Sequence, residues 1–331
     1  MKSGSAGQDY LKFIKKYWFM AGLGAVSLIT IADNTQILAG WGNWFKQRHA
    51  ADMVIVLIFI FSGLALTPEQ LKNGLTDVKG VLLTVVILFI IAPLIAAFFG
   101  LIPMNTGIII GLFIVAVMPS TMSSGVVMTA AAGGDAAHAL VSTIIANSAA
   151  AFTIPYTLTF LLQIIGESAS ITIDKTAMML KIFLLVVLPL TAGLLLKFLC
   201  GTLYERIGSK LNIINQTLIL FIVWIALSGT RSILLNSGST VGLIIVLSFV
   251  YHGILLICGW SLIQACRREK GKRESILFMG GQKTLSLSII LQVSLFPQYG
   301  IALLVCVIHH IVHLVMDGYL VEQFKAKNNS C

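Results

Sequence analysis

The sequence has few charged residues for its length: 11% of 331 residues are Asp, Glu, Lys or Arg, whereas soluble domains carry about 25%. Hydrophobic residues make up 57% of the chain, and its mean hydropathy is +0.95. A water-soluble globule of this size cannot bury so many apolar side chains, because much of any folded surface faces solvent. The composition therefore excludes soluble, disordered and collagen-like proteins and predicts an integral membrane protein.

Several other patterns are missing as well. No alternation of polar and apolar residues dominates, so a membrane β-barrel is disfavoured. The five cysteines are scattered, without the paired spacing of a disulfide framework or a zinc cluster. No small-residue cleavage site clearly follows the first apolar run, which argues against a secretory signal. No phosphate-binding loop, catalytic triad or redox pair is present, so we expect no enzymatic activity and no cofactor.

The apolar runs are long enough for membrane-spanning helices, which need about 20 residues each. We predict ten spans, at about 17–32, 51–66, 80–100, 106–131, 136–163, 177–200, 211–229, 240–263, 274–296 and 300–321. Lys and Arg are enriched in cytoplasmic loops, and a cytoplasmic N-terminus puts sixteen of them inside and five outside. Both termini are therefore expected in the cytoplasm, and the net charge of +9 indicates topology, not nucleic-acid binding.

An even division of the chain gives two halves of five spans. Because five is odd, the second half must run through the membrane inverted relative to the first, as in many secondary transporters. We expect a tail at 1–16, a first repeat at 17–165, a second repeat at 166–322 and a tail at 323–331. The bounds of the two repeats and the two tails all depend on the predicted count of ten spans.

The fourth span of each half contains helix-breaking and small polar residues. Span four reads Met118-Pro119-Ser120-Thr121-Met122-Ser123-Ser124-Gly125, and span nine reads Met279-Gly280-Gly281-Gln282-Lys283-Thr284-Leu285-Ser286. Irregular backbone at membrane depth is tolerated only inside protein or beside water. Packing by small residues is the plainer interpretation, but two such segments in equivalent positions favour discontinuous helices around a shared site.

Lys283 is the one Lys or Arg near the centre of a predicted span, where a charge costs about 2.5–3.5 kcal/mol. Its partner is expected among broken-helix carbonyls, the Ser123 and Ser124 hydroxyls, or an anionic substrate. A lysine that reaches to the membrane interface is the alternative. A buried lysine that loses its proton would instead carry protons.

Other polar residues lie on spans five and ten. Ser142, Thr143 and Asn147 follow the first break, and Asn147 is costly to bury without a hydrogen bond. On span ten, His309, His313 and Asp317 share one helical face, which suggests either a metal or proton-relay site or, preferably, a hydrogen-bonding stripe. The glutamate beside the first histidine of a catalytic zinc helix is missing. His310 is a further candidate for the substrate site.

These residues, in this order and spacing, resemble the bile acid:sodium symporter superfamily, in particular its SBF-like branch. The resemblance runs nearly end to end, and its further marks are Trp18-Phe19-Met20, Ser62-Gly63-Leu64-Ala65-Leu66 and Leu188-Pro189-Leu190. It implies an all-α membrane protein of ten helices in two inverted five-helix repeats, with discontinuous helices four and nine that cross. It also implies a panel domain, a core domain and alternating access.

The sequence departs from sodium-coupled relatives at the expected ion sites. Phe278 stands where they have a glutamate, Gly125 where they have an asparagine, and Lys283 where they have an uncharged residue. We therefore expect a secondary transporter or facilitator of an organic anion, with proton coupling or facilitated exchange favoured over sodium symport. The expected substrate or ion site comprises Thr121, Ser123, Ser124, Thr143, Asn147, Gln282, Lys283, Thr284 and His310.

Three alternatives stay open: a membrane regulator or scaffold that no longer transports, a sodium symporter with a rebuilt ion site, and an intramembrane metalloenzyme. The expected partners are a small organic anion and the lipid bilayer, not nucleic acid, and the chain is a monomer or a homodimer. The compact loops and the lack of targeting signals favour a bacterial inner membrane.

Overall fold

The computed structural model describes residues 18–19, 21–65, 77–166, 174–199, 201–229, 231 and 238–329, and within these ranges it is helical, without strands. The predicted N-terminal tail at 1–16 lies outside the described residues. Six helical segments are long and apolar enough to cross a membrane: Val78–Gly100, Ala136–Ile164, Lys175–Leu199, Thr240–Ala265, Lys272–Leu295 and Gly300–Ala326. The bent pair α2 (Ile37–Gln47) and α3 (Ala50–Leu64) counts as a seventh if it forms one span.

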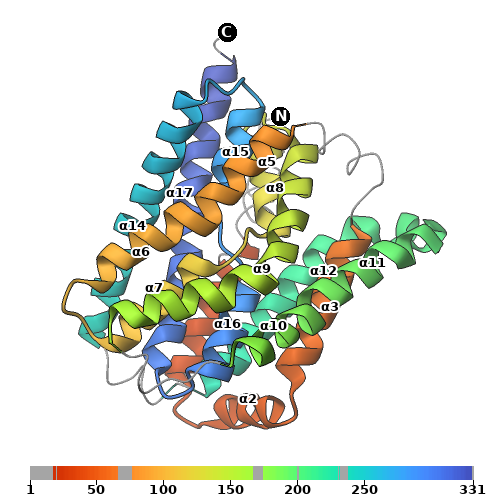
Figure 1. Cartoon of the computed structure of the whole chain (residues 1–331). Helices are drawn as coiled ribbons and strands as arrows, with labels where there is room; N and C mark the ends of the chain where they lie inside the picture. The colour runs from red at the N-terminus through yellow and green to blue at the C-terminus, as the bar shows by residue number, and fades with distance from the viewer. Residues whose placement is uncertain are drawn as a thin grey trace, which may run out of the picture.

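The helices form two groups (Figure 1). The larger group contains α5 (Val78–Val86), α6 (Ala92–Gly100), α7 (Thr106–Val117), α8 (Met122–Ala131), α9 (Ala136–Ile164), α14 (Gly238–Ala265), α15 (Lys272–Gly281), α16 (Leu285–Leu295) and α17 (Gly300–Asn329). The smaller group contains α3, α10 (Lys175–Ile182), α11 (Leu188–Leu199) and α12 (Gly201–Ser228), with α2 across one end. We call them the large group and the small group.

Glycine brings two helices of the small group into close contact. A Cβ atom added at Gly63 of α3 would overlap the main chain of α11, and one added at Gly193 of α11 would overlap the Ile60 carbonyl of α3. Small residues allow this backbone approach in membranes, where burial of apolar surface against lipid gives little driving force. The contact between α3 and α11 therefore depends on these two residues.

Two long helices contain a π-helical turn immediately before a proline. Segment η1 (Ile87–Ile91) joins α5 to α6 ahead of Pro93, and η3 (Phe183–Val187) joins α10 to α11 ahead of Pro189. Proline has no N–H and its ring clashes with the preceding turn, so a local widening of the helix relieves the conflict. The first of these turns contributes to the candidate site described below.

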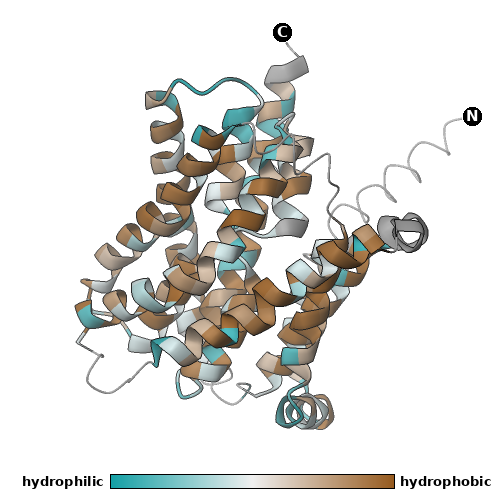
Figure 2. Ribbon diagram, turned by 45° about the vertical axis from the view of Figure 1, so that its right-hand side comes forward, coloured by the Kyte–Doolittle hydropathy of each residue, from teal (hydrophilic) through white to brown (hydrophobic). Residues whose placement is uncertain are grey.

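The outer surface is apolar. Figure 2 shows hydrophobic residues along most of the length of the helices, while the loop between α14 and α15 is hydrophilic. Large side chains such as Phe98, Phe160 and Leu199 are more than half exposed. Contiguous exposed apolar surface of this kind is suited to lipid, which agrees with the membrane protein that the composition predicts.

Two predictions about the ends of elements need correction. The stretch 33–50 was expected as a loop, but it contains the helix α2, whose start is fixed by hydrogen bonds from Ala39 N–H and the Thr35 hydroxyl to the Asp33 carboxylate. At the other end, α17 continues to Asn329, so the residues expected as a tail from 323 are helical up to there. Helix α2 does have the apolar periodicity of an amphipathic helix, so that pattern could have predicted it. The polar residues at the end of α17 carry no such pattern.

Candidate functional site

Both predicted helix breaks are present. In the first, α7 ends at Val117, Met118 and Thr121 are extended, and α8 begins at Met122. In the second, α15 ends at Gly281, Gln282 and Thr284 are extended, and α16 begins at Leu285. Neither N-cap residue, Thr121 nor Thr284, makes a side-chain capping hydrogen bond. The breaks leave two helix N-termini and two C-termini with main-chain groups that need other partners.

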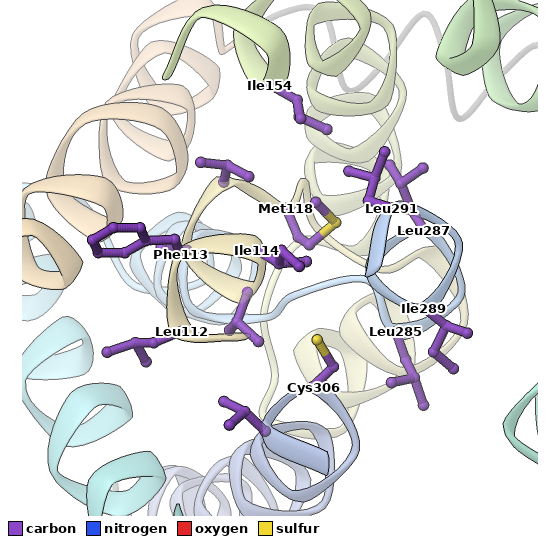
Figure 3. Packing of buried hydrophobic residues seen from close by; sticks show 14 of the residues in the cluster. Leu112, Phe113, Ile114, Met118, Ile154, Leu285, Leu287, Ile289, Leu291 and Cys306 are labelled. Carbon is purple, nitrogen blue, oxygen red and sulfur yellow. The ribbon is translucent and has the colours of Figure 1, made fainter. Parts of the chain in front are cut away.

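The two breaks bond directly to each other. Thr284 donates its backbone N–H to the Pro119 carbonyl at 2.9 Å, and its hydroxyl lies 2.9 Å from both the Pro119 and the Ser120 carbonyl oxygens. Asn147 of α9 donates its side-chain amide to the Ser120 carbonyl at 3.2 Å. Buried carbonyls released by the break therefore bond to residues far away in sequence. Figure 3 shows Met118, Leu285 and Leu287 packed with other apolar side chains around this crossing.

Lys283 is buried and its ammonium group donates to three main-chain carbonyls. The Nζ atom lies 3.2 Å from the Leu88 oxygen, 3.0 Å from the Ala116 oxygen and 3.1 Å from the Met118 oxygen. Only 2% of the residue is exposed, which rules out the alternative of a lysine that extends to the membrane interface. Of the partners considered from the sequence, the broken-helix carbonyls are the ones that it contacts.

The three carbonyls are available for identifiable reasons. Ala116 and Met118 lie at the C-terminal end of α7, where helical carbonyls lack intrahelical donors. Leu88 lies in η1, where the Ala92 N–H bonds to Ile87 and not to Leu88. The next N–H that could reach the Leu88 carbonyl in a π-helix belongs to position 93, which is proline and has none. Lys283 therefore satisfies carbonyls that the backbone leaves free.

Gln282 connects the crossing to a buried carboxylate. Its Oε1 accepts from the Ser124 hydroxyl at 2.8 Å, and its Nε2 donates to Asp317 Oδ2 at 3.0 Å. The other oxygen of Asp317 lies 3.0 Å from His252 Nε2. His252 of α14 was not selected from the sequence. A histidine in the middle of the apolar span eight was the signal that could have found it.

The predicted site residues do not all meet. Thr284, Lys283, Gln282, Ser124 and Asn147 come together as described. Thr143 donates to the Ala139 carbonyl of its own helix at 2.8 Å, and the side chain of Ser123 lies outside the described residues. Thr121 and His310 line the cavity described next.

A small cavity lies between the two groups of helices, beside the crossing. Its polar lining includes Ser62 and Asn215 from the small group and Ser120, Thr121, Asn147, Thr284, Ser286 and His310 from the large group. Its volume of about 30 Å³ has room for about two water molecules. Helices α8 and α16 begin next to lining residues, after Thr121 and Thr284. The N-terminus of a helix favours the binding of anions.

The metal hypothesis gains no support here. His309, His313 and Asp317 are all buried on α17, as their spacing predicts, but Asp317 pairs with His252 and Gln282. Among the described residues, no group of three or more His, Cys, Asp or Glu side chains is arranged to hold a metal ion. Asp317 instead forms hydrogen bonds, and His309 and His313 are in aromatic contact with each other.

The apolar helices indicate a multi-pass membrane protein, and the comparisons with known proteins identify it as a transporter. The chain belongs to the SBF-like CPA transporter family, whose model matches residues 17–326. It is 26% identical to sodium/bile acid cotransporter 7 of Xenopus tropicalis, over 96% of this chain and 94% of that protein. It is 25% identical to the probable sodium/metabolite cotransporter BASS4, chloroplastic, of Arabidopsis thaliana, over 80% of this chain and 64% of that protein.

Proposed function

We propose that this transporter carries an organic anion by alternating access, and that the Lys283 ammonium takes the place of a bound sodium ion. The observation that carries the proposal is the set of three main-chain carbonyls around Nζ, at 3.0–3.2 Å. Unwound backbone carbonyls at helix breaks are what coordinates sodium in many secondary transporters. A covalently held cation at such carbonyls leaves no need for a sodium ion there.

The surroundings of the break support the same proposal. Phe278, at the position where the resemblance places a carboxylate, is fully buried and packs with Ala132 and Val321. At Gly125, where the resemblance places an asparagine, a Cβ atom would come within 3.0–3.2 Å of Met279 and Gln282. An apolar ring and a crowded glycine supply no ligand for a metal cation, so coupling to protons or exchange of anions is favoured over sodium symport.

The nature of the substrate follows from the fixed charges. Helix N-termini at the cavity and a buried lysine favour a negative ligand. Because the cavity holds only about 30 Å³, an organic anion can enter only if the two groups of helices separate there. Movement of the large group against the small group, as core against panel, would expose the cavity to one side of the membrane and then the other.

The topology is part of the proposal. The six long segments, the bent pair and three shorter apolar helices, Ala21–Ala32, Thr106–Val117 and Ile213–Ser228, supply ten spans in two inverted repeats. The loop with Arg267, Arg268, Lys270, Lys272 and Arg273 would face the cytoplasm. Both termini would then be cytoplasmic, in a bacterial inner membrane.

The first test is a ligand screen on purified protein. We expect at least one organic anion, from a set of carboxylates and sulfonates that includes taurocholate, to raise the melting temperature, because a ligand of the folded state stabilises it. The anion should then enter proteoliposomes that contain the wild-type protein. Lys283→Met should abolish uptake, while Lys181→Met, which removes a lysine bonded to Ser294 at the surface, should leave it unchanged. Binding without uptake by the wild type would instead favour the regulator or scaffold.

A further inference from the structure

Four histidines form a buried cluster beside the Lys283 site. His252 belongs to α14, and His309, His310 and His313 belong to α17. The ring centres of His310 and His313 are 4.5 Å apart, and those of His252, His309 and His313 are mutually 5.5–5.7 Å apart. These four are the larger part of the six histidines in the sequence, gathered in the interior of a membrane protein.

The ring nitrogens of this cluster are poorly satisfied. His252 Nδ1, His309 Nε2, His310 Nδ1 and both nitrogens of His313 have no hydrogen-bond partner in the part of the chain that the structure describes. A buried polar atom without a partner costs about 1–3 kcal/mol. Imidazole nitrogens without a partner are available to bind a proton, which is the chemistry that histidine provides near neutral pH.

The cluster is connected at both ends. At one end His310 lines the cavity between the helix groups. At the other end His252 Nε2 contacts the Asp317 carboxylate at 3.0 Å, and Asp317 accepts from Gln282 at the helix break. The rings, with centres 4.5–5.7 Å apart, contact one another from His310 to His252. The four histidines and Asp317 therefore form one contiguous cluster, which reaches the cavity at His310 and Gln282 at Asp317.

Few other titratable groups face the cluster. Lys283 lies nearby, bonded to its three carbonyls, and Tyr251 stacks edge-on against His309 while it donates to the Ala92 carbonyl. Cys306 lies about one turn before His309 and His310 on α17 and is buried. Helices α7, α8 and α16, which pack against α17, contribute no ionisable side chain. On α12, which also contacts α17, the one ionisable residue whose side chain is described is Lys210, and it is exposed. Asp317 is thus the carboxylate that can balance an imidazolium here.

We propose that His252, His309, His310, His313 and Asp317 form a proton-binding site that couples proton movement to anion transport. This inference rests on the proposed function and adds its coupling site. A proton taken up from the cavity onto an imidazole nitrogen adds a positive charge beside the cavity and strengthens the binding of an anion. Binding of the anion strengthens binding of the proton by the same factor, so the two travel together.

The test measures protonation directly and needs no substrate. Full-length protein with ¹⁵N-labelled histidine, in lipid nanodiscs, is titrated from pH 5 to 9 by NMR. We expect the four core histidines to change together, and Asp317→Asn to abolish that change. Asp52→Asn is the matched control: it removes a carboxylate 3.4 Å from the exposed His49 and should alter the His49 signal alone.

Two results would overturn the proposal: core histidine signals that stay those of the neutral ring at every pH, or an unchanged titration in Asp317→Asn. If that variant fails to fold, His252→Gln keeps a donor for Asp317, and it should alter the response of the other three rings. An unchanged response of those three would count against the proposal equally. Because no anion is present, failure here leaves anion transport standing, and a failed anion screen leaves this result standing.

Discussion

Lys283 is the residue of the crossing whose role is clearest. Its ammonium group satisfies three buried carbonyls, from η1 and from the broken end of α7. The sequence alone showed that a charge lay inside a span and that broken-helix carbonyls were among its candidate partners. It could not show that Leu88 would be one of them, because that contact depends on a π-helical turn about 195 residues away in the chain.

Replacement of this lysine tests that role. Lys283→Met leaves three carbonyls without their donor, so we expect a loss of stability of about 2–4 kcal/mol. Lys181→Met is the control, because the bond of Lys181 to Ser294 is at the surface, and a change within about 0.5 kcal/mol is expected. The measurement is thermal unfolding of both variants in the same detergent. Equal melting temperatures for the two would contradict the structural role.

A second residue-scale prediction concerns Asp77, at the start of α5. Burial raises the pKa of its carboxyl, but hydrogen bonds from Arg268 and the Gly80 N–H outweigh burial and lower that pKa below its ordinary value. A lowered pKa in the folded state stabilises the protein above the unfolded-state pKa of about 4, and this contribution is lost as the pH falls further.

We therefore expect wild-type protein to be more stable than Asp77→Asn at pH 7, with the difference shrinking below about pH 4 as the wild-type carboxyl is protonated. Melting temperatures of the two proteins from pH 3 to 7 give the answer. A difference that is independent of pH would mean that the charge of Asp77 contributes nothing.

At the scale of elements, the two helix breaks could be predicted because proline, paired glycines and small polar residues interrupt apolar runs. The helix α2 could have been predicted from its amphipathic periodicity, but the π-helical turns could not. A π-turn differs from an α-turn by a single hydrogen-bond shift, and Pro93 and Pro189 are as compatible with a simple kink. His252 was missed for a similar reason, since its importance comes from Asp317 on another helix.

The contact between α3 and α11 gives an element-scale prediction. Gly193→Ala places a methyl group against the main chain of α3, and overpacking of this kind costs about 1–3 kcal/mol. Gly242→Ala on α14 is the matched control, because a Cβ atom there meets nothing within 4 Å. A lower melting temperature is expected for the first variant only. If both behave alike, close backbone approach is not what holds α3 to α11.

At the scale of the whole molecule, composition was enough to predict a helical membrane protein, and the positions of the breaks indicated where its site would lie. The helices divide into two groups, and the small group contains α3, α10, α11 and α12. Contacts between segments that are distant in the sequence determine this division. No local pattern encodes that division. The cavity at the boundary includes Ser62 and Asn215, and their place in it depends on how the small group packs against the large group.

Movement of one group against the other predicts that Ser62 changes its exposure. In a variant whose native cysteines are replaced, Ser62→Cys should react with a membrane-impermeant thiol reagent added to either side of the membrane, because the cavity opens to each side in turn. Leu255→Cys on α14, fully buried and away from the cavity, is the control and should stay unreactive. Reaction from one side alone, at every substrate concentration, would argue against alternating access.

The central claim is that the Lys283 ammonium replaces a sodium ion, and the most direct measurement compares sodium with potassium. The melting temperature of the wild-type protein is measured while potassium chloride is replaced stepwise by sodium chloride, so that the ionic strength stays constant. An ion that binds only the folded state raises its stability as the ion concentration rises. Because Lys283 leaves no sodium site in this account, we predict the same melting temperature in both salts. A rise specific to sodium would show that a sodium site persists and would contradict the role assigned to Lys283.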